Sequence, residues 1–359
     1  MCLVGTYYKI TVKELENTSR KRAFAETVCH ANASSKKRRT SANDENTVDS
    51  KSTDNAKRTP GKRKQARKVP GFVNDGNLCY LNSIMQATLA NKPFVAEILR
   101  LEQIDDGSRA TTRPVTEEIA TLVHKRQQLE VASAASSRRD LPSLRGLKAA
   151  LAMHVPAFFT KEDQQDADEA FIHIVDAISK ENPSYRCPFS HTIGQTITCS
   201  NCGHKSLIEE QHIRQTMNLR PKSGKPSIEN VVADTFEKLL RGCNQCKGAA
   251  IEHTCSRTIV AFPQTLVVQL GRVDDWLQKI DDKFAPEETD KYKLGGIVHH
   301  RGSGRRGHYY AAVRSEDDEW SLADDARVRN MKHADALKRS STCSMFFYDV
   351  HTSHRNCKD

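Results

Sequence analysis

The stretch GFVNDGNLCYLNSIMQ, residues 71–86, decides the fold, because it places a cysteine between a turn and a helix. Gly76 and Asn77 are typical turn residues, and the apolar residues after Cys79 recur with the spacing of one helix face. Cys79 is therefore expected in the first helical turn, where unpaired N–H groups and the helix dipole lower the pKa of a thiol. For such a cysteine taken alone, a buried and unreactive thiol is the commoner outcome.

The composition indicates one structured region preceded by a basic segment. The chain has 359 residues, enough for two or three domains, and its 37% hydrophobic content supports a buried core. Residues 1–70 contain 17 Lys and Arg against 7 Asp and Glu, whereas the rest of the chain carries 38 of each. Residues 1–69 are predicted to be a disordered basic tail, because they lack sustained apolar periodicity. Structure is expected over residues 70–350, followed by a short C-terminal tail over 351–359.

Two basic clusters in the tail, residues 36–39 and 57–68, are typical of a nuclear-import signal. They favour a nuclear protein that binds an import receptor or another acidic partner, with the cytoplasm as the alternative location and a merely solvated tail as the simplest interpretation. Direct nucleic-acid binding is not favoured, because few aromatic residues are interleaved with the charges. The opening residues lack the features of a signal peptide and no apolar run reaches about 18 residues, so an intracellular protein without a membrane segment is expected.

Two CxxC pairs, Cys199 with Cys202 and Cys243 with Cys246, predict a metal site. Four thiolates from such pairs make a closed tetrahedral zinc site with no open position for water, so the zinc would be structural. Four unrelated thiols or a redox pair are the alternative interpretation. Four nearby side chains are alternative ligands: Cys187, His204, His253 and Cys255.

A histidine and a pair of carboxylates later in the chain supply the groups that a thiolate nucleophile needs. A Gly-rich loop between two β-rich segments predicts a hairpin with His308 at the start of its second strand. A further short strand ends at Asp324 and Asp325, and one of these can accept the ring N–H of His308 and fix its tautomer. Taken singly, His308 could be a core histidine and the aspartates a solvated turn. Together with Cys79 they indicate a catalytic triad.

Several motifs in a consistent order resemble those of the ubiquitin-specific proteases, which are papain-like cysteine deubiquitinases. Residues 71–83 resemble the cysteine box of that family, residues 165–169 its Gln-Asp-Ala-x-Glu helix, and residues 307–309 its histidine box. Residues 262–272 resemble a Pro- and Leu-containing strand, and residues 345–348 a closing aromatic strand. The two CxxC pairs match the zinc-bearing fingers of the family.

The resemblance implies an α+β fold for the structured region. A helical thumb over residues 70–180, zinc-stapled fingers over 187–255 and an antiparallel β palm over 256–350 would follow one another. The catalytic cleft of such a papain-like fold lies between thumb and palm. The resemblance implies no catalytic cofactor, only the structural zinc.

The resemblance also implies roles for individual residues. Cys79 would be the nucleophile, His308 the general base and Asp324 its orienting carboxylate, with Asn74 in the oxyanion hole and Asp325 as a candidate helper. The implied activity is thiol-dependent hydrolysis of the (iso)peptide bond after the C-terminal glycine of ubiquitin, so ubiquitin and ubiquitinated proteins are the expected partners. Two alternatives stay open: a catalytically weak ubiquitin-binding scaffold of the same fold, and a nuclear zinc-ribbon protein associated with nucleic acid.

Substrate-binding residues follow from the same resemblance, because ubiquitin ends in a basic tail with two terminal glycines. Asp166 and Glu169 lie three residues apart on one helix face, so both could pair with that tail. Their alternative role is to complement the helix dipole. Gly307 and Tyr309 would shape a slot that admits only a Gly-Gly terminus.

Two positions depart from the family pattern. Leu78 stands where threonine is usual beside the nucleophile, and this exchange could disturb the turn that holds Cys79. Ala170 stands where the helix motif usually has an aromatic residue, and Phe171 is expected to take over its packing.

Overall fold

The computed structural model describes most of the region in which structure is expected. The described residues are 69–104, 113–131, 138–219, 226–247, 250–272, 282–303, 307–315, 317–338 and 340–350. The two basic clusters of the predicted N-terminal tail and the predicted C-terminal tail lie outside these residues. None of the helices within the described ranges is long and apolar enough to cross a membrane.

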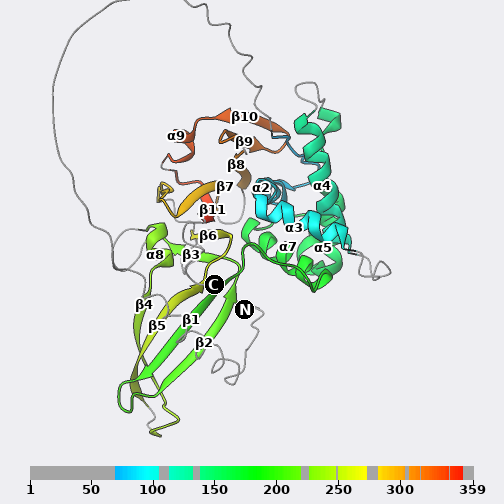
Figure 1. Cartoon of the computed structure of the whole chain (residues 1–359). Coiled ribbons are helices and arrows are strands. Elements are labelled where there is room, and N and C mark those ends of the chain that lie inside the picture. Colours follow the sequence, from blue (N-terminus) through cyan, green and yellow to red (C-terminus); the bar gives the residue numbers. More distant parts are fainter. Residues whose placement is uncertain are drawn as a thin grey trace, which may run out of the picture. The chain divides into compact units, whose positions relative to one another are not determined.

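Helices occupy the first half of the described chain and strands most of the second half (Figure 1). The helices before the first strand are α2 (Cys79–Leu89), α3 (Lys92–Gln103), α4 (Pro114–Val131), the 3₁₀ turn η1 (Arg138–Asp140), α5 (Arg145–His154), α6 (Pro156–Phe159) and α7 (Ala167–Glu181). Two short helices lie among the strands: α8 (Ile228–Val232) and α9 (His333–Ala336).

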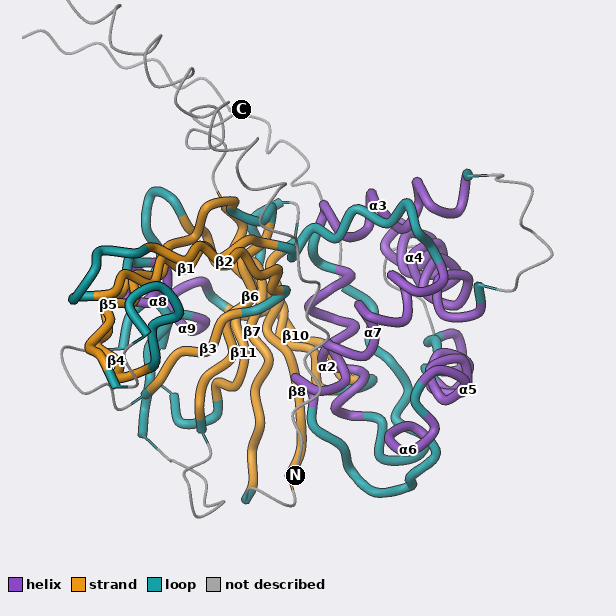
Figure 2. The backbone as a smooth tube through the Cα atoms, turned by 90° about the horizontal axis from the view of Figure 1, so that it is seen from below, coloured by secondary structure: helices purple, strands orange, loops and turns teal. Residues whose placement is uncertain are grey.

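The strands form two sheets. A four-stranded antiparallel sheet has the order β2-β1-β5-β4, and a seven-stranded sheet has the order β10-β9-β8-β7-β11-β6-β3. The strands are β1 (His191–Cys199), β2 (Lys205–His212), β3 (Gln215–Asn218), β4 (Thr235–Arg241), β5 (Ile251–Ala261), β6 (Thr265–Gly271), β7 (Tyr292–Gly302), β8 (Gly307–Arg314), β9 (Trp320–Asp324), β10 (Arg327–Met331) and β11 (Cys343–Val350). Figure 2 shows helices and sheets as separate halves that meet along α2 and β8.

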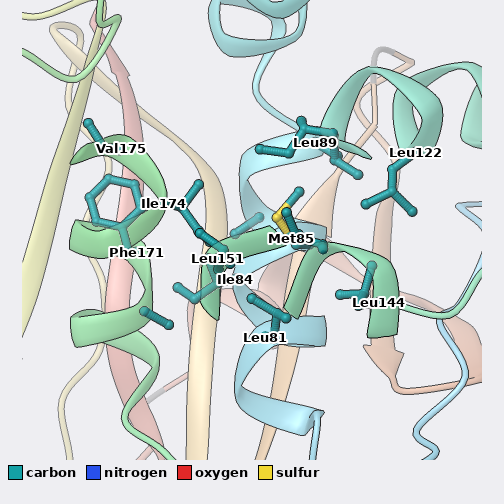
Figure 3. Close-up of a cluster of buried hydrophobic side chains, with 14 of the residues drawn as sticks. Leu81, Ile84, Met85, Leu89, Leu122, Leu144, Leu151, Phe171, Ile174 and Val175 are labelled. Carbon is teal, nitrogen blue, oxygen red and sulfur yellow. The ribbon is translucent and has the colours of Figure 1, made fainter. Parts of the chain in front are cut away.

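Helix α2 lies at the centre of the structure. All 11 of its residues are buried, as expected for a helix that is enclosed on every side. Its apolar side chains Leu81, Ile84 and Met85 pack with residues of α4, α5 and α7 in one cluster (Figure 3). Two buried polar side chains of α2 bond to other segments: Gln86 donates to the Pro70 carbonyl over 2.7 Å, and Asn82 donates to Asp325 over 2.8 Å. The helix that begins at Cys79 is therefore fixed on all sides.

The inner strands β6 and β11 of the seven-stranded sheet are buried on both faces, which explains their nearly continuous apolar residues. Alternate residues of a strand point to opposite faces. Val267 of β6 and the paired Phe347 of β11 belong to the cluster shared with the helices, whereas Val268 and the paired Phe346 belong to a second cluster. The sheet therefore supports the helical half on one face and has its own core on the other.

Phe171 takes the packing role expected of it. Its ring is fully buried and lies edge-on to Phe189 at 5.1 Å and to Phe347 at 5.7 Å between ring centroids. Ala170 beside it is also buried. The aromatic contact between α7 and the sheet is thus made one residue later than in the family motif.

The predicted α+β arrangement of thumb, fingers and palm is confirmed, with two differences in detail. Strand β3 falls within the predicted fingers (187–255) but joins the palm sheet, where it pairs parallel to β6, so the palm is not wholly antiparallel. Strand β5 belongs to the finger sheet and continues to Ala261, beyond the predicted boundary at 255. Sequence patterns identify strands, but the partner of each strand is chosen by the fold.

Candidate active site

Cys79 is the first residue of α2, as predicted. The residue before it, Leu78, makes no side-chain capping bond; instead its backbone N–H donates to Asn74 Oδ1 over 3.0 Å. Cys79 itself is only 4% exposed. Burial raises the pKa of the Cys79 thiol above its ordinary value, so the lowered pKa expected from the helix terminus is wrong for this state of the protein.

Three donors and one acid surround the Cys79 sulfur. The Tyr309 backbone N–H, the Gln164 side chain and the Tyr80 backbone N–H lower the pKa of the thiol, while the Asp325 carboxylate raises it. The Gln164 Nε2 atom lies 3.2 Å from Cys79 Sγ. Burial outweighs the three donors, so the neutral thiol is favoured until a further positive charge comes close.

His308 and Asp324 form a hydrogen-bonded pair beside this cysteine. His308 is the second residue of β8, Asp324 is the last of β9, and His308 Nε2 lies 2.5 Å from Asp324 Oδ1. Because Nε2 faces the carboxylate, Nδ1 is the ring nitrogen left for a nucleophile. The neighbour of His308 in β8, Tyr309, donates its N–H to the Cys79 sulfur. The start of β8, which carries His308, therefore lies against Cys79, and the His308 ring is bonded to Asp324 of β9.

Gln164 is a residue of this site that the sequence analysis did not identify. Its Nε2 donates to the Gly307 carbonyl over 2.6 Å, and the Gly307 N–H donates back to Gln164 Oε1 over 2.7 Å. A side chain at position 307 would collide with the ring of His300, which explains the glycine. The available signal was the position of Gln164, directly before the recognised motif of residues 165–169.

Asn74, the predicted oxyanion donor, is held by Asp325. Asn74 Nδ2 donates to Asp325 Oδ2 over 2.8 Å, and Asn82 Nδ2 donates to Asp325 Oδ1 over 2.8 Å. Asp325 has a φ of 50°, in the left-handed region that aspartate tolerates better than most residues. Its own carbonyl accepts from the Phe72 N–H over 3.0 Å. Asp325 thus anchors the segment before Cys79 to the turn after Asp324.

Leu78 is a core residue rather than a defect of the turn. Its side chain is 1% exposed and belongs to the cluster around α2. The turn before Cys79 is held by the backbone of Leu78 and by Asn74, so the exchange from threonine leaves those bonds in place. Restoring threonine here would bury a hydroxyl group where the core now has an apolar side chain.

The two candidate substrate carboxylates differ in their environment. Asp166 is the N-cap of α7: its Oδ1 accepts the N–H groups of Asp168 and Glu169, and its Oδ2 accepts the Tyr309 hydroxyl over 3.1 Å. Burial and the nearby Asp166 raise the pKa of Tyr309, so this hydroxyl stays protonated and donates. The Glu169 side chain is 58% exposed, with an imidazole nitrogen of His173 3.7 Å away. Asp166 is therefore engaged at the start of α7 and with Tyr309, and the role of both acids in binding substrate stays a prediction.

The four cysteines of the CxxC pairs gather at one end of the finger sheet. The sulfur of Cys199 lies 3.9 Å from that of Cys246, and Cys202 Sγ lies 3.7 Å from Cys243 Sγ. A tetrahedral zinc with bonds of about 2.3 Å separates its sulfur ligands by about 3.8 Å, so the group fits the ion. Among the described residues, none of the four alternative ligands joins this group.

The group of His308, Asp324 and Asp325 is also compact enough to be considered as a metal site. Two ligands of one ion lie about 3 Å or more apart, given metal–ligand bonds of about 2.0–2.2 Å. The 2.5 Å separation of His308 Nε2 and Asp324 Oδ1 is that of a direct, charge-assisted hydrogen bond. The two side chains are therefore bonded to each other rather than spaced as two ligands of one ion.

Comparison with known proteins agrees with this geometry. A family model described as "Ubiquitin carboxyl-terminal hydrolase" matches residues 70–348. Ubiquitin carboxyl-terminal hydrolase 2 of Homo sapiens is 25% identical over 353 residues, which cover 80% of this chain and 56% of the relative. Probable ubiquitin carboxyl-terminal hydrolase 16 of Schizosaccharomyces pombe is 24% identical, with 73% and 63% covered. The chain thus spans little more than half the length of these curated relatives.

Solved structures support the same fold. The SAGA Ubp8/Sgf11/Sus1/Sgf73 DUB module bound to ubiquitin aldehyde contains a chain that matches with a TM-score of 0.64 at 19% identity, covering 81% of this chain and 71% of that one. A second structure of the module, bound to monoubiquitin, matches with a TM-score of 0.62 at 18% identity, covering 96% and 77%. From the family match and the shared fold, we conclude that the chain belongs to the ubiquitin carboxyl-terminal hydrolase family, as one of its ubiquitin-specific proteases.

Proposed function

We propose that this chain is a thiol-dependent deubiquitinase that hydrolyses the (iso)peptide bond after the C-terminal glycine of ubiquitin. The observation that carries the proposal is the hydrogen-bonded pair of His308 and Asp324 beside Cys79. The Cys79 sulfur itself accepts hydrogen bonds from the Tyr309 N–H and from Gln164. A nucleophile, a base and an orienting carboxylate are the three parts that acyl transfer through a thiolate requires.

The proposed reaction proceeds through a thioester. His308 Nδ1 accepts the Cys79 proton, and the sulfur attacks the carbonyl carbon of the terminal glycine, so that a C–S bond forms and the carbonyl oxygen becomes an anion. The imidazolium gives its proton to the leaving amine as the C–N bond breaks. Water then attacks the thioester while His308 accepts its proton, and the thiolate leaves. A positive imidazolium next to the buried sulfur supplies the charge that the isolated thiol lacks.

The oxyanion in this scheme is stabilised by Asn74. One N–H of its amide donates to Asp325 and its oxygen accepts the Leu78 N–H, which fixes the amide plane before substrate arrives. Donors that are oriented in advance are the effective ones in an oxyanion hole. Asp325 is therefore assigned to positioning Asn74.

Exchange of Asp325 for asparagine separates this positioning role from the effect of its charge. Asparagine keeps the tolerance for positive φ but cannot accept bonds from both Asn74 and Asn82, so ubiquitin turnover should fall about 10- to 100-fold. The same exchange removes a negative charge that raises the pKa of Cys79, so alkylation of Cys79 by iodoacetamide below that pKa should become faster. Asp318→Asn, at another residue with positive φ, is the matched control. If ubiquitin turnover and the rate of Cys79 alkylation both fell, or both rose, the assignment of Asp325 to positioning Asn74 would be contradicted.

The tail of ubiquitin is proposed to lie between α7 and β8. Glu169 would pair with its arginines, and Gly307 with Tyr309 would border the slot for the two glycines. Asp166 contributes indirectly, because its bonds to the Tyr309 hydroxyl and to the start of α7 hold these two elements together. The four finger cysteines would hold a structural zinc at a distance from the reacting atoms.

An electrophilic ubiquitin probe tests the function directly. The zinc-loaded full chain should form a covalent adduct with a ubiquitin vinyl electrophile and should hydrolyse a fluorogenic ubiquitin C-terminal amide. Cys79→Ala should do neither, while Cys187→Ala, which removes a thiol outside the site, should do both. A folded wild type that matches Cys79→Ala in both assays would refute the proposal.

A catalytically weak ubiquitin-binding scaffold is the second candidate. It is favoured by one observation: the Cys79 thiol is buried and its pKa is raised. The scaffold predicts ubiquitin binding without probe capture or turnover, so the same experiment distinguishes the two functions.

A further inference from the structure

Gln164 occupies a position that the proposed mechanism does not explain. It lies on the segment between α6 and α7, two residues before the N-cap Asp166, and is half-buried. Its one amide group makes three hydrogen bonds: two with the backbone of Gly307 and one with the sulfur of Cys79. The segment before α7 is thereby connected both to the helix of the nucleophile and to the strand of the base.

The two bonds with Gly307 fix the orientation of the amide. Nε2 faces the Gly307 carbonyl at 2.6 Å and Oε1 faces the Gly307 N–H at 2.7 Å. A flipped amide would place two donors against each other and two acceptors against each other, so the observed assignment is the stable one. The second hydrogen of Nε2 then has a single direction available to it, and Cys79 Sγ lies 3.2 Å from this nitrogen.

The Cys79 sulfur has particular need of such a donor. It is buried, and the carboxylate of Asp325 acts against its ionised form. A fixed N–H aimed at the sulfur stabilises the anion and opposes both effects. Two backbone groups also donate to this sulfur: the Tyr80 N–H of α2 and the Tyr309 N–H, two residues beyond Gly307 on β8. Gln164 therefore acts on the sulfur directly and also through the position of β8, which carries the Tyr309 donor.

We propose that Gln164 is a positioning residue of the nucleophile: its clamp on Gly307 sets the start of β8 against Cys79, and its remaining N–H stabilises the ionised, attacking form of the sulfur when the proton leaves. This inference deepens the proposed deubiquitinase function and rests on it only for the consequence on turnover. The effect on the thiol is a property of the free protein and can be measured without ubiquitin.

The test is the pH dependence of Cys79 alkylation by iodoacetamide in the zinc-loaded full chain, followed at the Cys79 peptide by mass spectrometry. Gln164→Met keeps the length of the side chain but removes its donor and acceptor. We expect the midpoint of its profile to rise by about one pH unit, so that alkylation at a fixed pH below the midpoint is about tenfold slower. Gln165→Met is the matched control, because the Gln165 amide donates to the Asp163 carbonyl and not to the site. Its profile should stay that of the wild type.

Gln164→Glu provides the second measurement. Its carboxylate still accepts the Gly307 N–H but cannot donate to the sulfur, so its midpoint should also rise. A wild-type midpoint in Gln164→Met, or equal shifts in Gln164→Met and Gln165→Met, would overturn the proposal, as would a shift confined to the charged Gln164→Glu. Thermal melting and zinc content establish that each variant is folded. If the wild type fails to turn over ubiquitin while the alkylation profiles shift as expected, the proposed function fails and the role of Gln164 stands.

Discussion

Replacing His308 with alanine should lower kcat/KM for a fluorogenic ubiquitin amide by about a thousandfold, within the 10²–10⁴ range typical of a general acid–base group. The loss should be large because burial and Asp325 both favour the neutral Cys79 thiol, which makes the enzyme depend on a base to remove the proton. The same imidazole protonates the leaving amine in the proposed mechanism. One substitution thus removes two steps of proton transfer.

Asp324→Asn should lower kcat/KM by a smaller factor, about a hundredfold, because the imidazole remains but loses the carboxylate that orients it. His124→Ala is the control: His124 also contacts a carboxylate, that of Glu102, but its side chain is exposed and lies on α4, outside the site. Its turnover should equal that of the wild type. If His308→Ala retains more than a tenth of the wild-type rate, His308 is not the base and the triad must be reassigned.

Loss of the finger metal should produce the largest change in stability. Each chain should bind one zinc through Cys199, Cys202, Cys243 and Cys246, and chelation or Cys243→Ser should lower the melting temperature by roughly 10 °C or more. The reason is that strand β4, which lies between the two cysteine pairs in sequence, is exposed along most of its length and so contributes little apolar packing. Metal–sulfur bonds should therefore contribute much of the stability of this end of the finger sheet.

Cys255→Ala is the control for this experiment, since Cys255 lies on β5 of the same sheet but outside the metal group. It should bind zinc with the wild-type stoichiometry of one ion per chain. Below the melting temperature, zinc-free protein should still react at Cys79, because the nucleophile and triad lie on α2, β8 and β9. A melting temperature that is indifferent to zinc would show that the four thiols are not a structural metal site.

Local sequence was sufficient wherever a feature depends on neighbouring residues. The turn and apolar period around Cys79 predicted a helix that begins at that residue, and the Gly-rich loop predicted a hairpin with His308 at the start of its second strand. The CxxC spacing predicted the cysteine group. Each of these signals lies within a few residues of the feature it predicts, where backbone geometry leaves few alternatives.

Contacts between distant segments could not be read in this way. The parallel pairing of β3 with β6 depends on where two remote strands meet. Apart from its position directly before the motif of residues 165–169, Gln164 carries no local signal of its function, since its partners Gly307 and Cys79 are 143 and 85 residues away. The contact of the Asp166 carboxylate with the Tyr309 hydroxyl joins residues 143 positions apart, so the sequence around Asp166 gives no sign of it.

The sequence by itself determined that Cys79 opens a helix after a turn, and which residue types are available to activate it. Only the tertiary structure decided how deeply that thiol is buried and in which direction its pKa is shifted. Enclosure of α2 on every side buries the sulfur and raises its pKa, against the local effect of the helix terminus, while Gln164 and the Tyr309 N–H oppose that rise. The helix terminus acts through groups adjacent in sequence, whereas burial depends on everything packed around the helix, so the fold and not the motif sets the reactivity of Cys79.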